Sequence, residues 1–399
     1  MRKIRNIHLI SIAKLMSSNI FSSAMTYISL LALGLFFDNE SFGKFSSIYY
    51  ILGISYFLLD LGLPNALVLR YSQFNSSFRI RDLIKKFFIF YLFIFLFLFL
   101  YLYFSFSILI SISIIISALA GVLLKFNSTK LQVIGDWGGS ASIIFYLPMV
   151  RSVTILIFCL LIYFSVKVNK DFIYIFLAFA SIISAGLSYF KTKKIDYTES
   201  NFDGMLTLAW KLYLANLLAI ICMRADVILI SHFFDSETAG KYAKISIIFF
   251  AAPVVISAIN TVFVRELSAK NIKREGISAV SSRLLKLVVI FVIPLAVIFA
   301  ILYYGGVISI ERVSFSIIIL LLLSHSGALV MGVWEAYILK SSQNYFLLIK
   351  AAQLAFFLLV FISTFRTIGV VSAAIAFLSS RMIGWVLVII FINKKQVWN

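Results

Sequence analysis

Charged residues are scarce in this chain of 399 residues. Asp, Glu, Lys and Arg together make up 13% of the sequence, whereas soluble globular proteins contain about 25%. Hydrophobic residues make up 62%, and they occur in runs long enough to cross a bilayer as helices of about 20 residues each. This composition excludes a soluble domain of any size. It predicts an all-α polytopic membrane protein.

Cysteine and proline are rarer still, with two and four residues. The two cysteines, Cys159 and Cys222, lie inside apolar runs, which excludes both a disulfide framework and a thiolate metal site. No metal site and no resident cofactor are expected. The prolines lie inside or at the ends of apolar runs, where each removes a helical hydrogen bond and favours a kink; they are Pro64, Pro148, Pro253 and Pro294.

The apolar runs predict about twelve transmembrane helices with short polar loops between them. The third and fourth runs are nearly fused around residues 105–111. The expected spans are 9–36, 45–68, 87–106, 109–126, 140–165, 172–190, 206–232, 242–264, 284–304, 313–339, 344–365 and 368–392.

Lysine and arginine are distributed unevenly over the loops between these spans. If the N-terminus is cytoplasmic, the inside segments carry 23 of them and the outside segments carry 7. Such a bias predicts that both termini are cytoplasmic. The net charge of +19 is then explained by topology and by attraction to anionic lipid. A nucleic-acid partner is not expected, because no folded basic domain is present to bind one.

Two stretches of the chain align without a gap at an offset of 197 residues. Lys14–Ile48 lies over Lys211–Ile245 with 10 identities in 35 positions, and the best part is FFDNESFGKFSSI against FFDSETAGKYAKI. A second match, NALVLR (65–70) against NTVFVR (260–265), follows with a slip of two residues. The offset is close to half of the chain, which predicts two parallel six-helix bundles, residues 1–200 and 201–399. Repeats of this kind are typical of transporters.

Several charged residues fall inside the predicted spans. A charge at the centre of a bilayer costs roughly 2.5–3.5 kcal/mol even on permissive scales, so such residues commonly line polar interiors, pair with each other or contact substrate. Lys350 lies near the end of its span, where a lysine can snorkel. The remaining candidates are Asp60, Arg151, Arg224, Asp226, His325, Glu335 and Arg381.

Three of these candidates are arginines placed deep in their spans. Arg224 and Asp226 are two residues apart and point about 200° away from each other on a helix, so they cannot pair side by side. Asp226 could neutralise Arg151 or Arg381 on another helix, but one acid cannot neutralise three arginines. A net positive interior suits an anionic substrate, above all phosphate groups that a guanidinium binds in bidentate fashion.

Two segments resemble a known family. LLDLGLPNALVLRY (58–71) looks like the end of the second span of polysaccharide flippases, and MRADVILISHFFDSETAGKYAKI (223–245) resembles their seventh span and following loop. The chain therefore resembles O-antigen flippases of the multidrug, oligosaccharidyl-lipid and polysaccharide exporter (MOP) superfamily. The resemblance implies a MATE-like fold in the bacterial inner membrane. It also implies transfer of undecaprenyl-diphosphate-linked oligosaccharide from the cytoplasmic to the periplasmic leaflet by alternating access.

The resemblance also implies a cation-lined central cavity and coupling to an ion gradient, with H+ or Na+ as the ion. Arg151, Arg224 and Arg381 are the predicted substrate contacts, and the predicted residues for ion coupling or charge pairing are Asp226, Glu335, His325 and Asp60. A polysaccharide polymerase and a chain-length regulator are the expected protein partners.

Three alternatives remain. A multidrug antiporter of the same superfamily would need acidic residues in its cavity, whereas this interior is net basic. A flippase for peptidoglycan precursor usually has more than twelve spans. A membrane enzyme of polysaccharide assembly, such as a polymerase or glycosyltransferase, normally needs a sizeable loop with clustered catalytic groups. No DxD or HExxH cluster is present, so we do not expect an enzyme.

Overall fold

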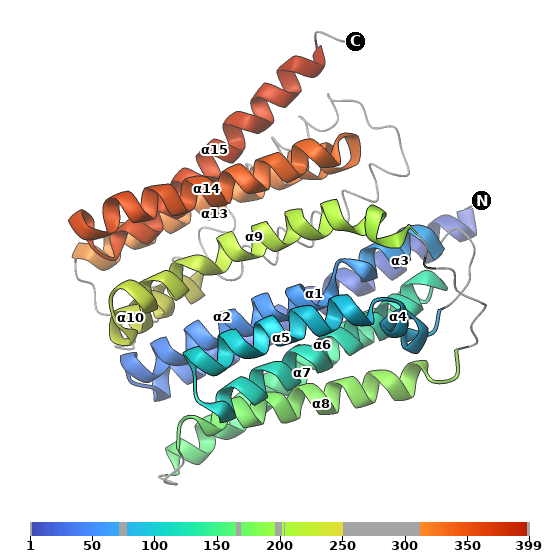
Figure 1. The fold of residues 1–399 in the computed structure, drawn as a ribbon, viewed down its shortest axis with the longest axis horizontal. Helices are drawn as coiled ribbons and strands as arrows, with labels where there is room; N and C mark the ends of the chain where they lie inside the picture. Colours follow the sequence, from blue (N-terminus) through green and yellow to red (C-terminus); the bar gives the residue numbers. More distant parts are fainter. Residues whose placement is uncertain are drawn as a thin grey trace. The chain divides into compact units, whose positions relative to one another are not determined.

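The computed structural model describes residues 2–71, 78–164, 169–195, 202, 204–249 and 312–396. Every regular element in these ranges is an α-helix (Figure 1). In the first half of the chain the helices are α1 (Arg2–Phe36), α2 (Asn39–Asp60), α3 (Leu63–Tyr71), α4 (Ile80–Lys86), α5 (Phe88–Ser105), α6 (Ile108–Val133), α7 (Trp137–Tyr163) and α8 (Phe172–Thr192). In the second half they are α9 (Met205–Phe233), α10 (Ser236–Ile248), α13 (Arg312–Ser341), α14 (Gln343–Ile368) and α15 (Val371–Gln396).

Eight of the described helices are long and apolar enough to cross a membrane. They are α2, α5, α6, α7, α8, α9, α14 and α15, and shorter apolar stretches lie within α1 and α13. This confirms a multi-pass, all-α membrane protein. The predicted ninth span (284–304) and most of the eighth (242–264) lie outside the described residues. The nearly fused third and fourth runs form two helices, because α5 ends at Ser105 and α6 begins at Ile108.

The predicted second span, 45–68, is wrong in its start and in its continuity. Helix α2 begins at Asn39 and ends at Asp60, and α3 begins only at Leu63. Between them Leu61 and Gly62 have φ angles of 53° and 65°, in the left-handed region that no helix of L-residues continues through. A Cβ on Gly62 would lie 2.7 Å from the Cβ of Tyr213, so this break requires glycine.

The internal repeat is confirmed residue by residue at the start of α2 and α10. Asp38 accepts hydrogen bonds from the backbone N–H of Ser41 at 2.7 Å and from its hydroxyl at 3.1 Å. Asp235 accepts the same two bonds from Thr238, at 2.6 and 3.0 Å. Both aspartates therefore cap the helix that follows, by satisfying an N–H group that has no partner within the helix.

The repeated glycines allow these two helix starts to touch. A Cβ on Gly43 would lie 1.8 Å from the carbonyl oxygen of Ser236, and a Cβ on Gly240 would lie 1.8 Å from that of Asn39. The offset of 197 residues pairs Gly43 with Gly240 and Asn39 with Ser236, so the contact is reciprocal. The two loops consequently lie at the same end of their helices, as a parallel repeat requires.

The chain forms two compact units. The first contains the described residues of Met1–Phe36 and Ile51–Tyr213, and the second contains those of Phe37–Tyr50 and Leu214–Asn399. In the first unit α1 packs on α7, and α6 and α7 both pack on α8. In the second unit α13, α14 and α15 pack together, with α10 against α13. A domain border between residues 200 and 201 remains a prediction.

Candidate functional site

The predicted site residues occur in both units. Asp60 and Arg151 belong to the first unit, and the second unit contains Arg224, Asp226, His325, Glu335 and Arg381. Each group is described within its own unit. The roles of these residues in binding and coupling remain predictions.

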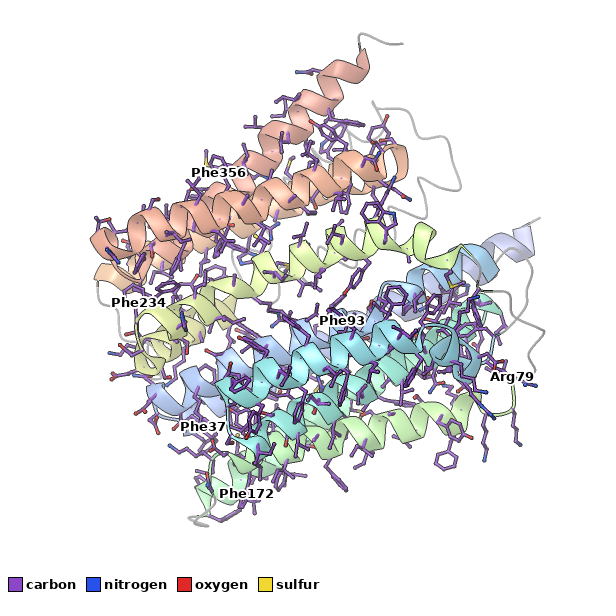
Figure 2. All side chains as sticks on the ribbon, viewed as in Figure 1. Phe37, Arg79, Phe93, Phe172, Phe234 and Phe356 are labelled. Carbon is purple, nitrogen blue, oxygen red and sulfur yellow. The ribbon has the colours of Figure 1, made fainter. Side chains whose placement is uncertain are left out.

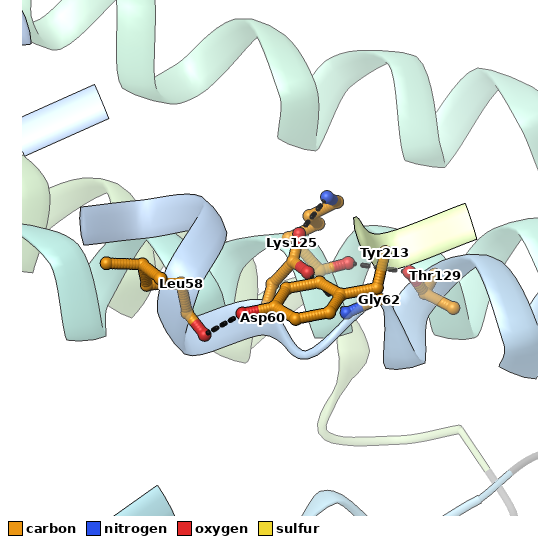
Figure 3. Close-up of polar contacts among 6 residues, drawn as sticks. All are labelled: Leu58, Asp60, Gly62, Lys125, Thr129 and Tyr213. Carbon is orange, nitrogen blue, oxygen red and sulfur yellow. Dashed lines mark hydrogen bonds and ion pairs between the residues drawn. The ribbon is translucent and has the colours of Figure 1, made fainter. Parts of the chain in front are cut away.

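Asp60 closes α2 with a buried ion pair (Figure 3). Its carboxylate is 2% exposed and accepts a charged hydrogen bond from the ammonium group of Lys125, on α6. The other carboxylate oxygen accepts the backbone N–H of Gly62 at 2.6 Å, which fixes the turn into α3. The Lys125 ammonium also lies 4.8 Å from the centre of the Phe57 ring, a cation–π distance. Asp60 is therefore held as a structural anion at the helix break.

Arg151 lies near the middle of α7 and reaches α8. Its Nε and one terminal nitrogen both donate to the hydroxyl of Ser181, at 3.2 and 2.9 Å. The Ser181 hydroxyl itself donates a hydrogen bond to the carbonyl of Leu177, one turn earlier, at 2.7 Å. At these contacts the guanidinium is held by a neutral hydroxyl rather than by a carboxylate.

Asp226 is buried in the second unit and accepts a hydrogen bond from a tyrosine hydroxyl. The Tyr242 hydroxyl, on α10, donates to one carboxylate oxygen at 3.0 Å, and the backbone N–H of Val227 donates to the other at 2.9 Å. Asp226 forms no ion pair with any other residue that the structure describes. Its suggested pairing with Arg381 is therefore absent. Arg224 instead places its guanidinium 4.5 Å from the centre of the Tyr50 ring.

His325 and Arg381 meet in an aromatic environment. The His325 ring stacks on Phe249 with centroids 5.8 Å apart and lies 5.3 Å from the ring centre of Phe377. The Arg381 guanidinium lies 5.0 Å from the Phe377 ring. Within the described part of the chain, Nδ1 of His325 and Nε of Arg381 are buried without a hydrogen-bond partner. Buried polar atoms of this kind usually have a function or a partner still to be found.

Glu335 is paired with a lysine from the neighbouring helix. The Lys350 ammonium, on α14, donates to the Glu335 carboxylate at 2.7 Å and to the side-chain oxygen of Gln353 at 3.3 Å. Lys350 is 4% exposed in this unit, so snorkelling to a polar surface does not describe it. Gln353 is in turn held close to Gly384, where an added Cβ would lie 2.1 Å from its amide nitrogen.

The partners of the three acids, Lys125, Tyr242 and Lys350, were not predictable from the sequence pattern. Lys125 lies at the end of a predicted span, Lys350 was expected to snorkel, and Tyr242 is a common residue type that gives no separate signal. The useful signal was the rule that a buried charge needs a partner. It says that Asp60 has a cation nearby, but not which one. In the described residues no group of three or more His, Cys, Asp and Glu side chains could hold a metal ion.

Comparison with known proteins finds likeness in structure alone. No protein-family model and no curated protein sequence matches this chain. A structure of the lipid II flippase MurJ in an inward closed conformation matches with a TM-score of 0.71 and 13% identity, over 95% of this chain and 87% of that one. An outward-facing multidrug resistance MATE family transporter of the MOP superfamily matches with a TM-score of 0.62 and 13% identity, over 96% and 95%.

A third similar structure is a MOP superfamily transporter from Pyrococcus furiosus, described as having a binding pocket of reverse polarity. It matches with a TM-score of 0.51 and 13% identity, over 96% of this chain and 95% of that one. At such low identity these matches show the fold. They confirm the predicted all-α, MATE-like fold.

Proposed function

We propose that this protein is a flippase that moves an undecaprenyl-diphosphate-linked O-antigen oligosaccharide from the cytoplasmic to the periplasmic leaflet of the bacterial inner membrane, with both termini in the cytoplasm. The observation that carries the proposal is that the acidic side chains Asp60, Asp226 and Glu335 in the described spans already have ion-pair or hydrogen-bond partners. Asp60 is paired with Lys125, Glu335 with Lys350, and Asp226 is bonded to Tyr242. None of the three forms an ion pair with an arginine described here.

Arg381 forms no ion pair with a described acid, so its charge can attract an anionic substrate. Arg151 is held by a serine hydroxyl, and Arg381 keeps a buried Nε without a partner in the described residues. A guanidinium in a poorly solvated site binds phosphate strongly and in a directed way. In this mechanism the lipid tail stays in the bilayer while Arg151, Arg224 and Arg381 contact the diphosphate or acidic sugars in turn. Rocking of the two bundles exposes the site alternately to each side.

The likeness to a structure named a lipid II flippase supports a lipid-linked substrate for this fold. The likeness to multidrug transporters supports the second candidate, a small-molecule antiporter. A cationic drug would need a carboxylate that is not already engaged, and the described acids argue against this candidate. For a flippase, coupling to H+ or Na+ would use Asp226 first, because it is the buried acid without a cation partner in the described part. His325, Glu335 and Asp60 are further candidates.

The test uses bacteria that lack their own O-antigen flippase. Expression of this chain should restore surface polysaccharide and remove the accumulated lipid-linked intermediate. Arg151→Ala, Arg224→Ala and Arg381→Ala should each lower display by about tenfold or more, the effect of losing roughly 1.4 kcal/mol of substrate contact, and lysine should rescue in part because it restores charge without the planar fork. Arg366→Ala is the matched control, since Arg366 is an exposed arginine at the end of α14.

Two results would contradict the proposal. Normal display by all three alanine variants at equal protein level would remove the cationic mechanism. Failure of the wild-type chain to restore display, together with export of cationic dyes, would favour the antiporter. Proteoliposomes with an imposed H+ or Na+ gradient would then identify the ion, and Asp226→Asn should abolish the dependence. A polymerase and a chain-length regulator are the proposed partners, to be sought by cross-linking in the native membrane.

A further inference from the structure

A pocket of 1010 Å³ opens on the first unit, and Arg151 is not among its lining residues. Short helix α4 and the final turns of α6 and α8 surround it, and Figure 2 places Arg79 at this end of the unit. One carboxylate, that of Asp82, lines it. The basic side chains in the lining are Arg79, Arg81, Lys85, Lys130 and Lys193.

Below this basic rim the pocket continues as an apolar groove between α6 and α8. Its walls are Ile116, Leu119 and Leu123 on one helix and Ile182 on the other. These side chains are 36%, 40%, 40% and 50% exposed, so they face outward from the unit. Ile116 and Lys130 are 14 residues apart, which on an α-helix is about 21 Å. That length matches a headgroup plus one leaflet of a hydrocarbon core about 30 Å thick.

The floor between the two helices is fixed by hydrogen bonds. The side-chain amide of buried Asn127, on α6, donates to the hydroxyl of Ser188 at 2.9 Å, and Thr192 donates to the oxygen of the same amide at 3.1 Å. Halfway along the groove, an added Cβ on Gly186 would meet no atom within 4 Å. The pocket is therefore a preformed space with a rigid base and an open wall.

We propose that this pocket binds an anionic phospholipid of the surrounding bilayer, with its phosphate among Arg81, Lys85, Lys130 and Lys193 and an acyl chain along the groove. Basic pockets between transmembrane helices at the cytoplasmic side commonly bind such headgroups. The excess of positive charge selects an anionic over a zwitterionic headgroup. The apolar groove selects a lipid over a soluble phosphate, which would leave it uncovered. This inference does not depend on the proposed transport activity.

The chain provides matched controls for a direct test. Lys85 and Lys193 line the pocket, whereas their neighbours Lys86 and Lys194 are also exposed but lie outside the lining. The full-length protein, purified in detergent, is titrated with phosphatidylglycerol or with phosphatidylethanolamine of the same acyl chains. Bound lipid is counted by native mass spectrometry. The variants are Lys85→Gln/Lys193→Gln and, as control, Lys86→Gln/Lys194→Gln.

Wild-type protein should retain one tightly bound phosphatidylglycerol in preference to phosphatidylethanolamine. The pocket variant should bind it about 30-fold more weakly, which is about 2 kcal/mol or about 1 kcal/mol for each charge removed. The control should change affinity less than threefold. Gly186→Phe, which fills the groove and keeps every charge, should also weaken binding, and this separates a lipid site from a general surface attraction.

Three results would overturn the inference. Equal losses in the pocket and control variants would show attraction to net charge only. Equal retention of both lipids would show that the rim does not select an anion. Displacement of bound phosphatidylglycerol by millimolar inorganic diphosphate, with no effect of Gly186→Phe, would assign the pocket to a soluble phosphate. Folding of each variant is checked by its elution as a single species before titration.

Discussion

Adding one methyl group at Gly43 or Gly240 should separate the two repeated helix starts. A Cβ at either position would lie 1.8 Å from a backbone carbonyl oxygen of the facing helix, far inside any real contact distance. No rotamer change removes such a clash, because the obstacle is backbone. Overpacking typically costs about 1–3 kcal/mol, and a rigid backbone neighbour places Gly43→Ala and Gly240→Ala at the upper end of that range.

A glycine without a facing neighbour provides the control. Gly186 lies inside α8, and an added Cβ there meets nothing within 4 Å. Because alanine is the better helix former by roughly 0.5–1 kcal/mol, Gly186→Ala should be neutral or stabilising. The three variants therefore make the same chemical change in two different environments.

The measurement is thermal unfolding of purified protein, followed by light scattering and tryptophan fluorescence. Gly43→Ala and Gly240→Ala should each lower the midpoint by several degrees, since about 2–4 °C corresponds to 1 kcal/mol in domains of 150–250 residues. The double variant should lose less than the sum, because the first methyl group already separates the helices that the second would separate. Melting curves for both variants that coincide with Gly186→Ala would refute the close approach.

Three further outcomes are expected. Tyr242→Phe removes the hydroxyl that donates to buried Asp226 and should cost about 1–3 kcal/mol; no loss in the melt would mean that water replaces it. Lys125→Met leaves the Asp60 carboxylate buried without its cation and should lower the free energy of unfolding. The loss should stay below the roughly 3–5 kcal/mol of a fully buried pair, because Lys125 is 24% exposed. Adding Asp60→Asn to the same chain should recover part of this loss. Asp235→Ala should cost about 1 kcal/mol at pH 7 as a lost cap. The hydrogen bond from the backbone N–H of Thr238 lowers the pKa of the Asp235 carboxyl below the ordinary 3.8. The stabilisation by the ionised cap is therefore fully present above pH 3.8 and is lost as the pH falls through the lower pKa of the folded state. The melting curves of the variant and the wild type should converge at that low pH.

The all-α membrane class was predictable because about 20 apolar residues in a row have few alternatives to a membrane helix. The helix starts were not. The predicted spans began at 45 and 242, and the helices begin at Asn39 and Ser236, an error of six residues in both halves. The reason is the same in each: the first turns are polar and are stabilised by an aspartate cap rather than by apolar contact, and hydropathy does not report capping.

Polar contacts between residues far apart in the sequence were the second feature that hydropathy could not predict. The predicted fourth span ended at residue 126, because Asn127, Thr129 and Lys130 interrupt the apolar run. In the structure α6 continues to Val133, and the polar side chains of its last turns have partners on other helices. Lys125 forms an ion pair with Asp60, and the side-chain amide of Asn127 is hydrogen-bonded to Ser188 and Thr192. Polar residues that would end a span in isolation extend it when a neighbouring helix supplies their partners.

The two halves of the repeat have kept and changed different kinds of residue. The positions that stayed identical, such as Asp38 with Asp235 and Gly43 with Gly240, cap helices or allow close packing, as the hydrogen bonds and the glycine contact show. The buried acid and its donor both differ in the first half, where Asp226 corresponds to Ser29 and Tyr242 to Phe45. An acid without its hydroxyl donor would be costly in this environment, so the two substitutions are linked physically. The duplicated scaffold thus preserves its geometry at the shared positions, while Asp226 on α9 and Tyr242 on α10 form a buried contact that the first half does not repeat. For that reason the Asp226–Tyr242 pair is the first place to look for ion coupling.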